Sequence, residues 1–342
     1  MLYLDENHIK KIGVNWRRNI EVISNSVKCL WSGEFSQPIK PYVKFPNSKN
    51  RIIAMPAYIG DKLNVAGIKW IASFPENIHH GLKRANSITV LNNAENGMPF
   101  GLINTSLISG IRTAAVSGLI LMEFDKIRFL EKAEVGIIGY GPIGQLHLQM
   151  IASVLGERLY KIKIFDTNGV RPELIPEELR NKVNIVDQWE VAYDESDVFV
   201  TCTVSSQGYI HREPKAGALI LNVSLRDFKP EILDYTQSII VDNWEEVCRE
   251  NTDIEKMHIF RGLKKENTKS IIDVICNDGM KHFPTRQAII FNPMGMAVFD
   301  ISIAFEYYTL ARQQGVGVQL NEEVKEIDEV SHAESNITSY SI

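Results

Sequence analysis

The stretch VGIIGYGPIG at residues 135–144 decides the fold of this 342-residue chain. Its apolar start predicts a buried strand, and three glycines follow at the GxGxxG spacing of a dinucleotide-binding turn. After the turn, apolar residues recur along one helical face, at Ile143, Leu146, Met150, Ile151 and Val154. A strand, a glycine turn and a helix in this order predict a Rossmann-type βαβ unit.

Each glycine of the turn has its own physical task. Gly139 permits the tight turn, Gly141 lets the backbone approach a pyrophosphate, and Gly144 lets the helix pack closely on the strand. The N-terminus of the helix holds the anion with free N–H groups and its dipole, which adds Pro142 and Ile143 to the predicted cofactor contacts.

An acidic residue after the second strand indicates which nicotinamide cofactor is used. The strand over residues 160–165 ends in Asp166, which lies 22 residues beyond Gly144 (166 − 144 = 22). A carboxylate at this distance accepts hydrogen bonds from the adenosine ribose hydroxyls and repels a 2′-phosphate. The sequence therefore predicts NAD as the cofactor, in preference to NADP.

Polar residues after two later strands complete the predicted cofactor site. Open α/β sheets gather ligands at the carboxyl ends of their strands. The residues expected there are Thr201, Cys202, Thr203 and Ser224. For Cys202, a role as a small buried hydrophobe is favoured over a role as a nucleophile.

Two parts of the chain differ in their pattern of apolar residues. From residue 133 to 292, short apolar runs alternate with helical stretches, which is typical of a doubly wound parallel α/β sheet. The first part of the chain mixes a helix around residues 20–30 with strand-like runs, which predicts an α+β domain. These runs cover residues 51–56, 65–71, 88–91 and 100–103.

Two long helices are expected beside the nucleotide-binding part. Apolar residues over 105–122 recur every three or four positions, which predicts one buried helical face, and a second helix follows Asn292-Pro293. We predict a nucleotide-binding domain over residues 114–293, an α+β domain over 1–113 with 294–325, and a loose polar tail over 326–342.

Composition excludes several classes of protein. A formal net charge of -5 leaves no basic surplus for nucleic acid. The charged N-terminal sequence has no apolar export signal, which predicts a cytosolic location, and the least charged region, residues 96–122, is too polar to cross a membrane. Four widely spaced cysteines, and no recognisable ligand spacing, predict neither a disulfide framework nor a metal site.

Four motifs resemble those of the ornithine cyclodeaminase/mu-crystallin family. They are the glycine turn, GIKW at 67–70, IRTAA at 111–115 and NPMGMA at 292–297. The resemblance covers nearly the whole chain apart from the polar tail. It implies a homodimer, in which the N-terminal half and the C-terminal helix build the substrate and dimer surfaces while the middle of the chain binds NAD.

The resemblance also implies roles for single residues. Arg51 and Lys69 match residues that bind the carboxylate of the amino-acid substrate, while Arg112 and Thr113 match a pair beside the cofactor phosphates and the substrate. The chemistry agrees, because a guanidinium holds a carboxylate with two parallel bonds and an ammonium adds a compact charge. Lys69 lies in an apolar strand, where an unpaired charge is costly, and we expect it to manage the amine or water proton.

One position departs from the family pattern. Cyclodeaminases place a catalytic aspartate where this chain has Ser224, and a serine cannot hold the charge that activates water. Asp227 lies three residues later and is either a catalytic group or a cap or turn residue before Pro230. This departure favours a dehydrogenase over a cyclodeaminase.

The closer resemblance within the family implies the reaction. The chain is expected to oxidise a secondary amine that joins a 2,3-diaminopropionate skeleton to the α-carbon of glutamate, forming NADH, 2-oxoglutarate and L-2,3-diaminopropionate for siderophore or peptide-antibiotic assembly. Three alternatives stay open: redox-neutral conversion of ornithine to proline and ammonia, another amino-acid dehydrogenase such as an alanine dehydrogenase, and a non-catalytic dinucleotide-binding protein.

Overall fold

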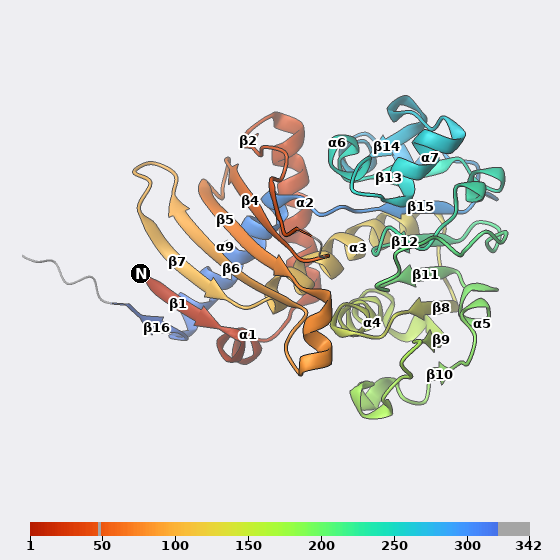
Figure 1. Ribbon diagram of the computed structural model, residues 1–342, viewed down its shortest axis with the longest axis horizontal. Helices are drawn as coiled ribbons and strands as arrows, with labels where there is room; N and C mark the ends of the chain where they lie inside the picture. Colours follow the sequence, from red (N-terminus) through yellow and green to blue (C-terminus); the bar gives the residue numbers. More distant parts are fainter. Residues whose placement is uncertain (47–48, 321–342) are drawn as a thin grey trace, which may run out of the picture.

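The computed structural model describes residues 1–46 and 49–320, and within them the chain forms two parts (Figure 1). Each part is built on one eight-stranded sheet, which we call sheet A and sheet B. The predicted polar tail lies outside the described residues.

Sheet A is mixed and has the strand order β16-β1-β7-β6-β5-β4-β2. Strand β3 also pairs with β4, along the residues of β4 that do not pair with β2. Its strands are β1 (Leu2–Asp5), β2 (Phe35–Ser36), β3 (Tyr42–Lys44), β4 (Arg51–Ile59), β5 (Val65–Ser73), β6 (Ala85–Asn93), β7 (Pro99–Asn104) and β16 (Val318–Gln319). The four strand-like runs predicted from the sequence lie within β4 to β7, which are antiparallel neighbours.

Helices cover one face of sheet A and connect it to the rest of the molecule. They are α1 (Glu6–Ile12), α2 (Trp16–Ser32) and α9 (Ala297–Gln314), of which α9 packs on β4, β5 and β6. Asn15 caps α2 by accepting from the Arg18 N–H, and Gly33 ends the helix with a φ of 81°. The predicted helix after Asn292-Pro293 is α9.

Sheet B is entirely parallel and has the order β10-β9-β8-β11-β12-β15-β13-β14. Its strands are β8 (Ala133–Ile138), β9 (Leu159–Phe165), β10 (Val183–Ile185), β11 (Val198–Thr201), β12 (Leu219–Asn222), β13 (Ser238–Val241), β14 (Thr268–Ser270) and β15 (Ile289–Asn292). The chain runs outward from β8 in one direction through β9 and β10, and in the other through β11 and β12. Ligands bind at such a switch point, and the arrangement confirms the predicted Rossmann-type class.

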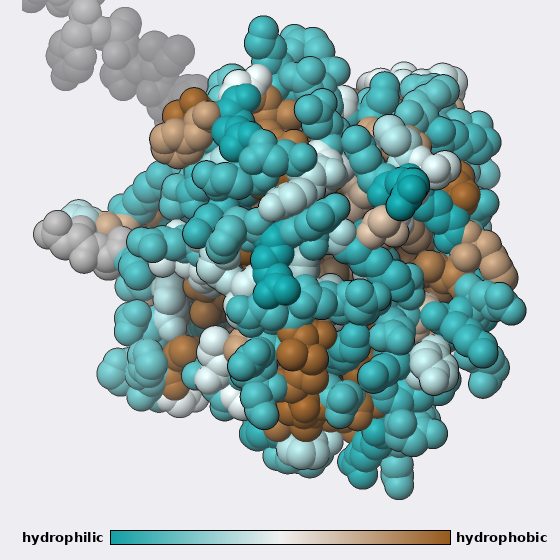
Figure 2. Space-filling model, turned by 90° about the vertical axis from the view of Figure 1, so that its right-hand side faces the viewer, coloured by the Kyte–Doolittle hydropathy of each residue, from teal (hydrophilic) through white to brown (hydrophobic). Residues whose placement is uncertain are grey.

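The helices of this part are α4 (Pro142–Leu155), α5 (Trp189–Tyr193), α6 (Trp244–Val247), α7 (Asp253–Arg261) and α8 (Ile271–Cys276). The side of the molecule that carries them is mostly hydrophilic, with a hydrophobic patch at the lower centre of the view and smaller ones elsewhere (Figure 2).

Helix α3 (Leu107–Ile127) joins the two parts, and here the prediction of one buried face is wrong. Every residue from 114 to 121 is buried, because α3 packs against α2, α4 and α9 at once. Two glycines permit this approach, since a Cβ at Gly110 or Gly118 would lie 2.6 Å from a side chain of a neighbouring helix. The prediction that residues 96–122 are too polar for a membrane span is wrong for the part in α3. Within the described residues α3 alone has the length and composition of a span, but 72% of its apolar window is buried inside the protein.

The two sheets draw on different parts of the chain. Sheet A takes its strands from residues 2–104 and 318–319, and sheet B from residues 133–292. The boundaries at 113/114 and 293/294 stay predictions, since α3 crosses the first of them and contacts helices of both parts.

Candidate active site

The glycine turn is tightly packed on one side and open on the other. Gly139 has a φ of +85°, and a Cβ there would lie 2.4 Å from the Cys202 carbonyl oxygen; at Gly144 it would lie 2.1 Å from the Gly139 carbonyl oxygen. At Gly141, by contrast, a Cβ would meet no atom within 4 Å. Gly141 is also the N-cap of α4 and brings no capping side chain. The turn therefore fits a pyrophosphate placed against the start of α4.

Asp166 lies beside this turn. Its carboxylate accepts hydrogen bonds from the Tyr140 N–H at 2.7 Å and from the Asn168 N–H at 2.8 Å. A carboxylate has about four acceptor positions, so two contacts leave capacity for ribose hydroxyls. The geometry fits the adenosine end of NAD.

Four of the predicted residues meet in one hydrogen-bond network after β11 and β12. The Ser224 hydroxyl lies 2.7 Å from the Thr201 hydroxyl and also contacts the Asp227 carboxylate, to which Thr203 donates at 2.6 Å. Asp227 is fully buried. It does not cap the 3₁₀ turn at Pro230–Asp234, whose N-cap is Lys229, so the capping alternative is wrong. Its catalytic role stays a prediction.

Cys202 is partly buried and packs against the hydrophobic core. Burial, helped by the charge of Asp227, raises the pKa of the thiol far above its usual value, and Sγ lies 3.8 Å from Nδ1 of the buried His147. A thiolate is disfavoured there, as expected for a buried hydrophobe rather than a nucleophile.

A buried ionic centre joins three elements. Nζ of Lys69, from β5, lies 2.9 Å from one Asp300 oxygen, and Nε of Arg112, from α3, lies 2.9 Å from the other. Asp300 itself comes from α9. All three side chains are buried, and Lys69 also donates to the Ser109 hydroxyl at 3.1 Å. Lys69 thus has the partner that its apolar strand requires.

Asp300 was not among the residues assigned from the sequence. The signal for it is a single acid inside the apolar run FDISIAF at 299–305, since a buried acid needs a counter-charge. The run does not reveal which cation that is.

The charges of this centre act on one another. Burial lowers the pKa of Lys69 to about 8, opposed by Asp300 and aided by Arg112. Burial acts to raise the pKa of Asp300, but Arg112 and Lys69 outweigh it and hold that pKa below its usual value. A pKa of about 8 makes the neutral amine of Lys69, the form that can accept a proton, accessible near that pH.

The NPMG motif packs against the guanidinium group of Arg112. Gly295 has a φ of +86°, and a Cβ there would lie 2.5 Å from Nη1 of Arg112. The Gly295 N–H donates to Asp242 at 2.6 Å, and Nζ of the buried Lys40 donates to the Gly295 carbonyl at 2.7 Å. A glycine is required here because the guanidinium occupies the side-chain space.

The other two predicted residues lie further from this centre. Arg51 is on the same face of sheet A as Lys69, because Arg51 pairs with Ser73 and Lys69 with Met55. Four residues of strand separate the two pairs, about 13 Å along the sheet. Thr113 donates its hydroxyl to the Ser109 carbonyl at 2.8 Å within α3. The structure therefore joins Lys69 to Arg112 but does not bring Arg51 into contact with them.

Comparison with known proteins places the chain among its relatives. The model of the ornithine cyclodeaminase/mu-crystallin family matches residues 10–314. The chain belongs to this family. It is 31% identical over 333 residues to the N-((2S)-2-amino-2-carboxyethyl)-L-glutamate dehydrogenase of Staphylococcus aureus, a match that covers 94% of this chain and 98% of the relative.

Solved structures share the fold of this family member. The Δ1-pyrroline-2-carboxylate reductase of Thermococcus litoralis, in complex with NADH and L-proline, has a TM-score of 0.83 at 20% identity and covers 94% of this chain and 100% of its own. An archaeal alanine dehydrogenase dimer with bound NAD has a TM-score of 0.80 at 22% identity and covers 94% and 99%. Both likenesses concern the fold.

Proposed function

We propose that the chain oxidises N-(2-amino-2-carboxyethyl)-L-glutamate with NAD, which yields NADH, 2-oxoglutarate and L-2,3-diaminopropionate. A hydride leaves the glutamate α-carbon and the amine loses a proton, which gives an imine. Addition of one water then splits the imine into the 2-oxo acid and the free diamine. The buried Lys69–Asp300–Arg112 centre carries the proposal, since it offers carboxylate binding and proton transfer together.

The chain is a nicotinamide-dependent oxidoreductase that acts on an amino-acid-derived substrate, as are the relatives named above. When bound, NAD supplies the hydride acceptor. The turn at Gly139, Gly141 and Gly144, with Pro142 and Ile143, holds the pyrophosphate, and Asp166 binds the ribose.

Helix α3, which carries Arg112 of the ionic centre, packs against α4, the helix that follows that turn. A Cβ at Gly110, two residues before Arg112, would lie 3.3 Å from Cδ1 of Ile143 in the first turn of α4. Two cations around one carboxylate leave a net positive charge, which attracts a substrate carboxylate. Lys69, with its pKa lowered to about 8, takes the amine proton so that the nitrogen lone pair can drive hydride departure.

We assign proton transfer in the hydrolysis step to the hydrogen-bond network of Thr201, Thr203, Ser224 and Asp227. Asp227 is buried and linked through the Ser224 hydroxyl to the carboxyl edge of sheet B. We assign Ser224 as the group that passes a water proton to Asp227. In this proposal, Ser224 and Asp227 together perform the task of the catalytic aspartate that cyclodeaminases have where this chain has Ser224.

One assay separates this reaction from its alternatives. Protein and NAD are mixed in turn with the secondary amine, L-ornithine, L-proline and L-alanine, while NADH absorbance is followed and products are identified by mass. The proposal expects NADH, 2-oxoglutarate and the diamine from the first substrate alone. Proline and ammonia from ornithine without net NADH would replace it with cyclodeamination, and NADH from proline or alanine would replace it with the corresponding dehydrogenase. Tight NAD binding with no product would leave a non-catalytic protein.

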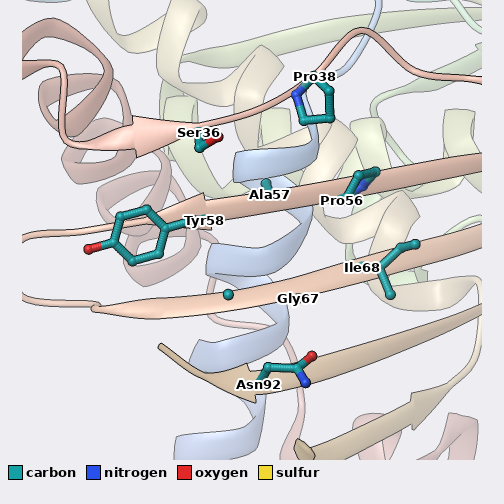
Figure 3. Close-up of a pocket in the computed structure, with 9 residues that line it drawn as sticks. Ser36, Pro38, Pro56, Ala57, Tyr58, Gly67, Ile68 and Asn92 are labelled. Carbon is teal, nitrogen blue, oxygen red and sulfur yellow. The ribbon is translucent and has the colours of Figure 1, made fainter. Parts of the chain in front are cut away.

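We infer a homodimer that forms through the outer face of sheet A. This face is opposite α9 and carries a hollow of about 360 Å³, lined in part by Pro56, Tyr58, Ile68 and Asn92 (Figure 3). Trp70, on the same face, is 41% exposed. An open apolar sheet face of this kind is typical of protein interfaces. Light scattering on the wild type and on Ile68→Asp tests the inference, which requires a dimer for the first and a monomer for the second.

A cytoplasmic location and a biosynthetic role belong to the same proposal. All four cysteines are free thiols, as in reducing compartments. The diamine product would supply siderophore or peptide-antibiotic assembly. Fractionation of the producing cells, and a search for a diamine requirement in a deletion strain, test both statements.

A further inference from the structure

A group of arginines lies at one end of sheet A, away from the Lys69 centre. Cζ of Arg51 is 5.7 Å from the ring centroid of Tyr42, on the neighbouring strand β3. Arg226, from the loop after β12, donates to the Glu250 carbonyl at 2.8 Å. The Glu250 carboxylate in turn pairs at 3.0 Å with Lys44, which is directly opposite Arg51 in the β3–β4 pair. Arg226 of one part thus reaches the strand end that carries Arg51 of the other.

Arg84 joins this group from the next strands. It immediately precedes Ala85, which pairs with Ser73, and Ser73 pairs with Arg51. Burial lowers the pKa of Arg84, and the charges of Arg51 and Arg226 lower it further. Burial likewise lowers the pKa of Arg226, with Arg51 as the next cause. The three guanidinium groups are therefore close enough to repel one another.

Nearby acids offset only part of this repulsion. The charges of Asp253 and Glu250 raise the pKa of Arg226, against burial and Arg51, and leave it below its usual value. Within residues 1–46 and 49–320, none of Arg51, Arg84 and Arg226 forms an ion pair with a carboxylate. Arg226 donates instead to the backbone carbonyls of Ser224 and Glu250. The neighbouring Arg249, by contrast, is paired with Glu246. Three like charges close together destabilise the folded protein. An anionic ligand that accepts hydrogen bonds from several of these guanidinium groups would offset the repulsion.

The position of the group relates it to the proposed reaction. Arg51 shares the inner face of sheet A with Lys69, about 13 Å away along the strand direction. Arg226 lies two residues after Ser224 and beside Asp227, at the carboxyl edge of sheet B. A substrate with carboxylates at both ends of an extended skeleton can reach both the Lys69 centre and the arginines.

We propose that Arg51, Arg84 and Arg226 form a subsite for the side-chain carboxylate of a dicarboxylic substrate, while Lys69 and Arg112 bind a carboxylate nearer the reacting carbon. The proposal thus separates Arg51 from Lys69, although the family resemblance assigns both to the same carboxylate. This inference rests on the proposed function and sharpens it. Arg84 and Arg226 determine specificity for a glutamate-derived amine over amines derived from monocarboxylic amino acids.

The test compares two substrates in three variants. One substrate is the glutamate-derived amine, and the other is the matching amine built on L-alanine, which lacks the side-chain carboxylate. For Arg84→Gln and Arg226→Gln we expect KM for the first substrate to rise roughly tenfold or more, with kcat changed little and KM for the second unchanged. Lys44→Gln removes a nearby exposed cation that is paired with Glu250, and we expect it to leave both substrates unaffected. Arg226→Lys should recover part of the loss.

Direct binding separates this subsite from the reaction itself. Calorimetry with 2-oxoglutarate and pyruvate, in the presence of NADH, should show binding of the dicarboxylate that weakens in Arg226→Gln, and melting curves check that each variant is folded. Equal effects on both substrates, or none, would overturn the subsite while leaving the reaction. Arginine-dependent binding of 2-oxoglutarate without turnover of the secondary amine would keep the subsite and overturn the proposed reaction.

Discussion

Replacement of Asp300 by asparagine tests the ionic centre most directly. The change keeps the shape of the side chain but removes the charge that lies 2.9 Å from both Lys69 and Arg112. Two cations then remain buried together without their anion. Loss of one partner from a buried ion pair costs about 3–5 kcal/mol of folding stability. We expect Asp300→Asn to lower the free energy of unfolding by this amount in denaturant titrations.

The same change acts on catalysis through Lys69. Asp300 favours the charged form of Lys69, so its removal lowers the pKa of Lys69 below about 8. A Lys69 with a lower pKa loses its proton at lower pH. The rise of kcat/KM with pH, expected near pH 8 in the wild type, should therefore shift toward acid. Poorer positioning of Lys69 and Arg112 should lower the maximum of kcat/KM by about 100-fold.

A matched control and a clear contrary result complete this test. Asp278→Asn removes a carboxylate that pairs with Lys281 on the surface, where water screens the charges, so it should change neither stability nor the pH profile. Asp300→Asn with the stability and pH profile of the wild type would refute the assignment of Asp300 as the residue that positions Lys69 and Arg112.

Three further predictions concern the cofactor site and Lys69. Gly141→Ala should keep the melting temperature, because a Cβ there meets no protein atom, yet weaken NAD binding roughly tenfold or more in calorimetry. Normal affinity would remove Gly141 from the pyrophosphate site. Asp166→Asn should reduce the preference for NAD over NADP, which competition binding measures, and an unchanged ratio would mean that another group selects the cofactor. The pKa of Lys69 is lower in the folded protein, at about 8, than its ordinary value of 10.5, so the unfolded chain binds more protons between these values. The free energy of unfolding of the wild type, relative to that of Lys69→Met, should thus rise as pH increases from about 8 to 10 in denaturant titrations. A difference that does not change with pH would contradict a buried Lys69 with a lowered pKa. Lys69→Met should also abolish turnover.

The nucleotide-binding part was accessible to sequence reasoning because its signals are local. The glycine turn, its strand and the helix that follows are contiguous, and Asp166 lies within the same βαβ unit. Where the prediction failed, distant contacts decided the outcome. The spacing of apolar residues in α3 indicated one buried face, but three helices pack around α3. The periodicity of one segment does not reveal how many other elements pack against it.

The candidate active site shows the same division. The apolar strand around Lys69 and the apolar helix around Arg112 indicated that each cation had a task, since an unpaired buried charge is costly. The shared partner remained hidden because Asp300 lies 188 residues beyond Arg112 in the chain. The arginine group was hidden for a similar reason, as Arg226 reaches Arg51 only through the packing of the two parts.

Local sequence was sufficient to predict the Rossmann-type class, the glycine turn and the position of the acid beside it, because backbone geometry and hydrogen bonds between near neighbours enforce these features. The packing of distant segments brings Lys69, Arg112 and Asp300 into one centre and gathers three arginines that form no ion pair with an acid among the described residues. Charges interact through space, and the fold alone sets which of them lie within a few ångströms of one another.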